Sequence, residues 1–81
     1  SLLPAFQEQL PESVKLDIME DLVRQKFSKS AKLRDLLVAT YPQELIEGNW
    51  WGDKFWGVDT KTGEGLNHLG KILMKVRNEL L

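Results

Sequence analysis

The sequence predicts a small, mainly α-helical domain of the α+β class, with a few short strands. Two observations support this prediction. Apolar residues recur at spacings of three and four in three separate segments, which is typical of helices with one buried face. Glycines, asparagine and all three tryptophans gather between the second and third of these segments. Turns and short extended pieces are therefore expected there.

The composition narrows the classes of protein. With 81 residues the chain makes one domain at most. It has no cysteine, which excludes disulfides and thiolate metal sites. Its 11 basic and 12 acidic residues give a net charge of −1, so no strong field favours nucleic acid or an anionic membrane. No apolar run is long enough for a membrane span and no signal segment is recognisable, so a cytoplasmic location is expected.

The first long helix is predicted over residues 11–29. Proline suits a first helical turn, and Glu12 favours the positive end of the helix dipole. The apolar residues of one face are expected to be buried, namely Val14, Ile18, Met19, Leu22, Val23 and Phe27. A shorter turn of helix is expected upstream, between Pro4 and Pro11.

The second helix is expected to begin after Ser30 and to end near Thr40. The Ser30 hydroxyl can accept an unpaired backbone N–H, and Tyr41 precedes a proline, which disfavours helical geometry. Its expected buried face consists of Leu33, Leu36 and Leu37. The short link leaves two arrangements open, an antiparallel pair of helices or an open angle.

Short strands are predicted over residues 45–47 and 54–58, and a loop over 59–65. Trp50 and Trp51 lie between the two strands. Adjacent residues of an extended segment point to opposite faces. One of these tryptophans is therefore expected to be buried, and the other to be free for a ligand or a partner.

The last helix is expected to start at Asn67, a preferred N-cap residue. Its buried face is expected to consist of Leu69, Ile72, Leu73, Val76 and Leu80. Gly63 and Gly65 precede this helix. The first N–H groups of a helix lack internal partners and attract phosphate, although many helices begin in this way.

Two carboxylates, Glu47 and Asp53, flank the tryptophan pair. Two such groups can divide acid and base roles, or one can stabilise a positively charged sugar. The structural alternative is that Asp53 fixes a turn and Glu47 pairs with a lysine. Because a planar heterocycle stacks well on indole, the residues alone predict a heterocycle or nucleotide pocket between this loop and the last helix. They predict no metal site and no cofactor.

An ordered set of short motifs resembles the NADAR family, also called YbiA-like. The set consists of LLVAT at 36–40, LIE at 45–47, DKFWG at 53–57, GLNHLG at 65–70, LM at 73–74 and Arg77. The likeness extends upstream through residues 12–27. It implies a compact, mostly helical fold with a few short strands. It also implies an N-glycosidase that splits ribose phosphate from a pyrimidine-type base in early riboflavin intermediates, or a related enzyme acting on ADP-ribose.

The resemblance assigns roles by motif position. Glu47 and Asp53 are implied to be catalytic, because a carboxylate can stabilise the positive charge that develops on the sugar. The residues implied to bind substrate are Trp56, Gly57, Asn67 and Gly70. Trp56 would stack on the base, and the helix start near Asn67 would hold a phosphate.

The chain departs from the family pattern at the tryptophan pair and at Asp59. Family members are also about twice as long, and their N-terminal half, with a lysine implicated in catalysis, has no counterpart. The resemblance therefore implies the C-terminal half of such a domain, as a fragment, one piece of a split enzyme or a shortened homologue. Expected partners are the small phosphorylated substrate and the N-terminal segment or a second chain. Two other functions stay open: a non-catalytic module that binds nucleotide or protein, and a helical interaction domain.

Overall fold

A computed structural model describes residues 10–81, and these residues form helices α2, α3 and α4 and one two-stranded sheet. The elements are α2 (Glu12–Lys29), α3 (Ala31–Ala39), β1 (Gly48–Asn49), β2 (Val58–Asp59) and α4 (His68–Leu80). The predicted mainly α, α+β class is confirmed. The helical turn expected between Pro4 and Pro11 lies outside the described residues.

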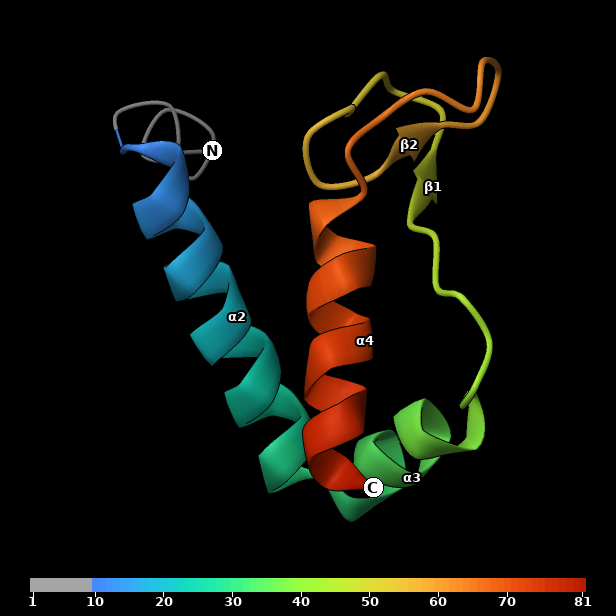
Figure 1. Cartoon of the computed structure of the whole chain (residues 1–81). Coiled ribbons are helices and arrows are strands. Elements are labelled where there is room, and N and C mark those ends of the chain that lie inside the picture. Colours follow the sequence, from blue (N-terminus) through green and yellow to red (C-terminus); the bar gives the residue numbers. More distant parts are fainter. Residues whose placement is uncertain (1–9) are drawn as a thin grey trace.

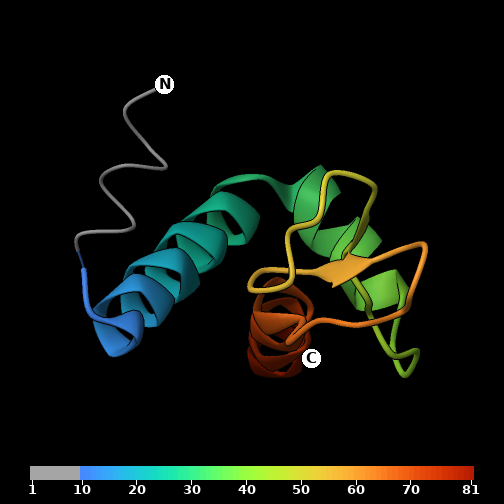
Figure 2. The same cartoon turned by 90° about the horizontal axis from the view of Figure 1, so that it is seen from above.

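The helices form an open frame. Helices α2 and α4 run in the same direction, converge at their C-terminal ends and diverge toward their N-terminal ends (Figure 1). Helix α3 crosses beneath the converging ends, so the link at Ser30 makes an open angle rather than an antiparallel pair. Strands β1 and β2 lie beside the start of α4, on the side away from α2 (Figure 2).

The buried core is small and joins the three helices. Its buried apolar residues are Val23, Leu37, Ile72 and Val76. The face predicted for α4 is confirmed, since each of its five apolar residues is buried or half-buried. The face predicted for α2 is wrong in part, because Val14, Ile18 and Leu22 are exposed. With 3.6 residues per turn, these three lie on a different side of α2 from Leu16, Met19, Val23 and Phe27, which are the residues of this helix that pack in the core. On α3, Leu36 is exposed as well.

The helix ends follow the sequence closely. Helix α2 begins one residue after Pro11, which takes the N-cap position without a side-chain cap. At the start of α3, the Ser30 hydroxyl accepts the N–H of Leu33 at 3.2 Å, which confirms its predicted capping role. Near the end of α4, the buried Arg77 donates from Nη1 to Thr40 Oγ1 at 3.0 Å and to the Gln43 carbonyl at 2.7 Å. Arg77 therefore fixes α4 to the segment that follows α3.

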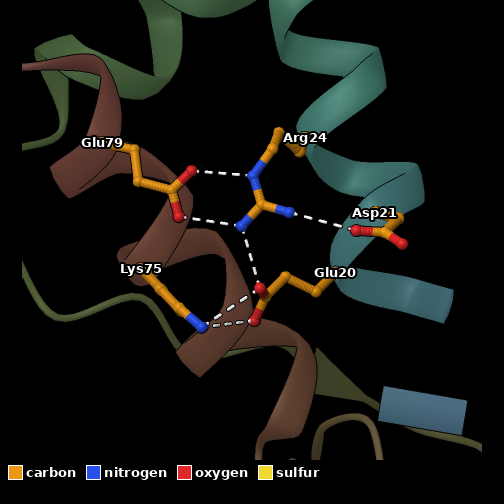
Figure 3. Close-up of polar contacts among 5 residues, drawn as sticks. All are labelled: Glu20, Asp21, Arg24, Lys75 and Glu79. Atoms are coloured by element: carbon orange, nitrogen blue, oxygen red, sulfur yellow. Dashed lines mark hydrogen bonds and ion pairs between the residues drawn. The ribbon is translucent and has the colours of Figure 1, made fainter. Parts of the chain in front are cut away.

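A cluster of charged side chains joins α2 to α4 (Figure 3). Arg24 donates from two nitrogens to the carboxylate of Glu79, each at 2.8 Å, and from Nη2 to Glu20 at 2.8 Å. Asp21 accepts a further bond from Arg24, and Lys75 donates to both oxygens of Glu20. The hydrogen bonds from Arg24 and Lys75 hold the pKa of Glu20 below its ordinary value, and Arg24 does the same for the pKa of Glu79. The cluster therefore favours the charged form of both carboxylates.

Candidate active site

The segment that carries Glu47 pairs with the segment that follows Trp56. Strands β1 and β2 are parallel, with Gly48 opposite Val58, and the Val58 N–H donates to the Glu47 carbonyl at 2.8 Å. A Cβ on Gly57 would collide with that carbonyl, so glycine permits the close approach. The strands predicted over 45–47 and 54–58 are wrong in position and extent, because the first lies outside β1 and the second shares only Val58 with β2. Pairing covers two residues in each strand because this backbone contact, and not a side-chain pattern, sets it.

Asn67 holds the Glu47 segment against the start of α4. It is buried and left-handed, with φ of 54°. Its Oδ1 accepts the N–H of Glu47 at 2.9 Å, and its Nδ2 donates to the Leu45 carbonyl at 2.9 Å. Asn67 takes the predicted N-cap position but makes no side-chain capping bond. A Cβ on Gly70 would strike both the Leu45 carbonyl and the Asn67 side chain, so Gly70 leaves room for these two bonds.

The start of α4 uses its backbone donors within the chain. The N–H groups of residues 66–69 donate to carbonyls of residues 54–57 at 2.8 to 3.2 Å. A phosphate at this end would have to compete with these bonds. Phosphate binding near Asn67 therefore stays a prediction, and the positions of Asn67 and Gly70 show a packing role toward the Glu47 segment.

A turn built by two side chains positions Asp53. The Asn49 side chain accepts the N–H of Asp53 at 2.8 Å and donates to its carbonyl at 2.7 Å, which closes the loop over residues 50–52. Asp53 Oδ1 then accepts the N–H groups of Phe55 and Trp56 at 3.0 and 2.9 Å. The structural role considered for Asp53 is thus present. Its second oxygen makes no hydrogen bond to any residue of the segment 10–81.

Two cavities meet at Glu47. A hollow of about 90 Å³ is lined by Glu47 and Leu69 together with Asn49, Trp51, Asp53 and Trp56. An open groove of about 360 Å³ lies between α2 and α4, and it is lined by Glu47 and Leu69 together with Met19, Lys26, Phe27 and Leu73. Ligand pockets usually hold about 300–1,000 Å³. The groove therefore has the size of a small-molecule site, and the hollow has room for one part of a ligand.

The Glu47 side chain is half-buried where these cavities adjoin. Its carboxylate makes no hydrogen bond or ion pair with any residue from 10 to 81, so the lysine pairing considered from the sequence is not found there. Of the six predicted site residues, Glu47, Asp53, Trp56 and Gly57 line the hollow. Asn67 and Gly70 do not line the hollow and contact the Leu45 carbonyl instead.

The tryptophan pair differs from its prediction. Trp50 and Trp51 are both exposed, at 77% and 66%, so the expectation that one is buried is wrong. Their rings meet edge to face, with centroids 5.6 Å apart. The reason is the loop closure by Asn49, which makes these residues bulge out of the strand. Trp56 is instead half-buried, lies 4.8 Å from the Phe55 ring and packs on the core.

Sequence reasoning missed three lining residues. Asn49 carried a signal, because asparagine before a glycine-containing aromatic segment is typical of a side-chain-closed turn. For Trp51, the sequence predicted that one residue of the tryptophan pair would be free for a ligand, but not which of the two. Lys26 carried no signal of its own, since only the packing of α2 beside α4 brings it to the groove that Glu47 lines.

The family model described as NADAR domain matches residues 2–81. The chain belongs to the NADAR family. Among its NADAR relatives, N-glycosidase YbiA of Shigella boydii and that of Escherichia coli are each 45% identical over 69 residues, which is 85% of this chain and 42% of the relative. The riboflavin biosynthesis protein PYRR, chloroplastic, of Zea mays is 41% identical over 70 residues, or 86% of this chain and 11% of the relative. The chain thus spans less than half the length of the curated relatives it matches. No solved structure matches it.

Two further findings concern metal sites and membrane spans in the described residues of this NADAR chain. Within residues 10–81, no three histidine, cysteine or carboxylate side chains gather in a way that could hold a metal ion. None of the helices in that part of the chain is long and apolar enough to cross a membrane. The resemblance stated from the sequence motifs is confirmed.

Proposed function

We propose that this NADAR chain forms part of a cytoplasmic N-glycosidase, which hydrolyses the bond between a phosphorylated ribose and a heterocyclic base. The observation that carries the proposal is Glu47, a half-buried carboxylate without a partner in residues 10–81, at the junction of a ligand-sized groove and a small hollow. The name N-glycosidase of the bacterial relatives supports the reaction class. The name of the maize relative favours intermediates of riboflavin synthesis as substrates, and an ADP-ribosyl base is the related possibility.

Glu47 and Asp53 have different tasks in the proposed reaction. As the bond from the sugar to the base nitrogen breaks, positive charge develops on the ribose, and the Glu47 carboxylate stabilises it. Water adds to the sugar carbon, and the free oxygen of Asp53 accepts a proton from this water and passes it to the departing nitrogen. The turn bonds to Asp53 Oδ1 keep the carboxylate in place during this transfer.

Lys26 supplies the positive charge that a phosphorylated ligand requires. It lines the same groove as Glu47, whose remaining walls are mostly apolar. A lysine ammonium binds phosphate as a point charge. A phosphate near Lys26 would direct the ribose toward Glu47 and the base toward the hollow.

The test is release of ribose 5-phosphate from phosphorylated ribosylamino-pyrimidines. It is measured with the 81-residue chain of confirmed mass, alone and mixed with the remaining part of a bacterial relative. Glu47→Gln should lower turnover about 100- to 1,000-fold. Asp53→Asn should also lower turnover, while it retains the acceptor oxygen of the turn. Glu44→Gln, at an exposed position outside both cavities, is the matched control and should leave turnover unchanged. Normal turnover of Glu47→Gln would refute the proposal.

Binding without turnover is the second candidate function. The use of Asp53 Oδ1 in a turn favours it, because one oxygen of a proposed catalytic carboxylate is already occupied. This candidate predicts that the phosphorylated ribosylamino-pyrimidine raises the melting temperature of the chain. No ribose 5-phosphate is then released, with or without the remaining part of a bacterial relative.

A further inference from the structure

Trp51 is an exposed aromatic residue that nevertheless lines the hollow beside Glu47. Its side chain is 66% exposed, and the hollow includes Asp53 and Trp56 on its other sides. An indole with this exposure leaves a large apolar face in water, and a planar ligand that stacks on it would remove that face from water. Trp50 is still more exposed, at 77%, but does not line the hollow.

The loop that carries Trp51 is closed at its base. The two hydrogen bonds between the Asn49 side chain and the backbone of Asp53, at 2.8 and 2.7 Å, join the two ends of residues 49–53. Within the loop, Gly52 has φ of 84° and open space around it. The Trp50 and Trp51 rings meet edge to face, with centroids 5.6 Å apart. The loop closure restrains the backbone that carries Trp51 before a ligand arrives, which limits the entropy lost on binding.

Trp56 is less suited to the same task. It is half-buried, lies edge to face with Phe55 and packs against the core cluster. A ligand ring would reach only the part of the indole that faces the hollow. Replacing Trp56 would also disturb the core, so a loss of binding in such a variant would not identify a ligand contact.

We propose that Trp51 stacks on the heterocyclic base of the ligand whose ribose lies beside Glu47, and so determines which bases the site accepts. This inference rests on the proposed function, and it assigns the base to the hollow and the ribose phosphate to the adjoining groove. The hollow, at about 90 Å³, has room for one ring system rather than for a whole nucleotide. Base–aromatic stacking contributes a factor of about 5 to 150 in affinity for each base.

The experiment compares two probes on the 81-residue chain, uridine 5′-monophosphate and ribose 5-phosphate, which lacks a base. Binding is followed through the three indole N–H signals in nitrogen-15 spectra, assigned with single-tryptophan variants. The nucleotide should shift the Trp51 signal and should bind about 5- to 150-fold more tightly than ribose 5-phosphate. Trp51→Ala should remove this advantage and leave the affinity for ribose 5-phosphate unchanged. Trp51→Phe should retain most of it, and Trp50→Phe is the matched control, with affinities within about twofold of wild type.

Three results would overturn the stacking role. The first is equal affinity for the two probes, and the second is a nucleotide affinity that Trp51→Ala does not change. The third is absence of nucleotide binding, including the case in which the tryptophan pair instead mediates self-association. The glycosidase proposal is judged separately by ribose 5-phosphate release. Base-dependent binding through Trp51 without release would refute the enzyme and retain the stacking role. Release of ribose 5-phosphate, together with a binding affinity that does not depend on Trp51, would retain the enzyme and refute the stacking role.

Discussion

Substitutions of Asn67 test how the site is held together. Asn67→Gly keeps a residue that adopts φ of 54° without strain, but removes the bonds to the Glu47 N–H and the Leu45 carbonyl, both at 2.9 Å. Each such bond contributes about 1 kcal/mol, so the free energy of unfolding should fall by about 2 kcal/mol. Asn67→Ala loses the same bonds and places a Cβ in the left-handed region, which costs about 1 kcal/mol more. The expected order of stability is wild type, then glycine, then alanine.

Asn67→Asp separates the two bonds. It keeps an oxygen that accepts the Glu47 N–H, but replaces the Nδ2 donor by an oxygen that faces the Leu45 carbonyl. Because two acceptors repel each other at this distance, aspartate should retain less than half of the stabilisation. The variant therefore shows whether one accepted hydrogen bond is sufficient at this position, or whether the donor and the acceptor of the amide are both required.

Urea unfolding, followed by circular dichroism and by tryptophan fluorescence, measures these differences, provided that the slope with urea stays constant. Gly63→Ala is the matched control, because Gly63 has φ of 74° and no atom near its missing Cβ. It reports the cost of a left-handed Cβ alone, about 1 kcal/mol. If the free energy of unfolding of Asn67→Gly lies within about 0.3 kcal/mol of the wild-type value, Asn67 does not hold the Glu47 segment and the reasoning fails.

Substitutions of Gly57, Arg77 and Glu79 test other parts of the fold. Gly57→Ala should cost about 3 kcal/mol by urea unfolding, because its Cβ meets the Glu47 carbonyl, whereas Gly52→Ala, in open space, should cost about 1 kcal/mol. Arg77→Leu should lower the free energy of unfolding by about 2–4 kcal/mol, since it leaves the Gln43 carbonyl without its donor, and Arg77→Lys should recover part of the loss. The lowered pKa of Glu79 stabilises the fold above the ordinary glutamate pKa of 4.5, and this contribution is lost as pH falls through the folded value. The melting temperature should therefore fall more between about pH 7 and pH 3 in wild type than in Glu79→Gln; equal falls would contradict the role of the cluster.

The local sequence predicted the positions of the helices better than it predicted which of their residues are covered by neighbouring helices. The spacing of Leu69, Ile72 and Val76 was sufficient to identify the buried face of α4, and Ser30 was sufficient to identify the start of α3. The equally regular pattern of α2 predicted burial for Ile18 and Leu22, which are exposed. Periodicity identifies apolar residues on one side of a helix, but the neighbouring helices decide which of them are covered, and on α2 these are Leu16, Met19, Val23 and Phe27.

The sequence motifs predicted which residues gather at the hollow, while their roles stay predictions and their geometry was not predictable. Motif likeness named Glu47, Asp53 and Trp56, and the structure brings them to one hollow. The role of Asn67 depends on bonds to backbone groups 20 and 22 residues away, which no local pattern encodes. The side chains of Asn49 and Asn67 bond the backbone in place of longer strand pairing, so β-propensity predicted strands at 45–47 and 54–58 rather than at 48–49 and 58–59.

The polar contacts that build the hollow and those that attach α2 span very different lengths of chain. The bonds of Asn49 and Asn67 join residues 4 to 22 positions apart, whereas the Arg24–Glu79 contact joins residues 55 positions apart. Short loops cost less entropy to close, so the segment from Leu45 to Gly70 is expected to fold first and to open last. In the native ensemble α2 can then detach while the hollow persists, and the amide of Val58 should exchange its hydrogen more slowly than the amides of α2. Such openings would remove the α2 wall of the groove and leave Glu47 and Asp53 in place.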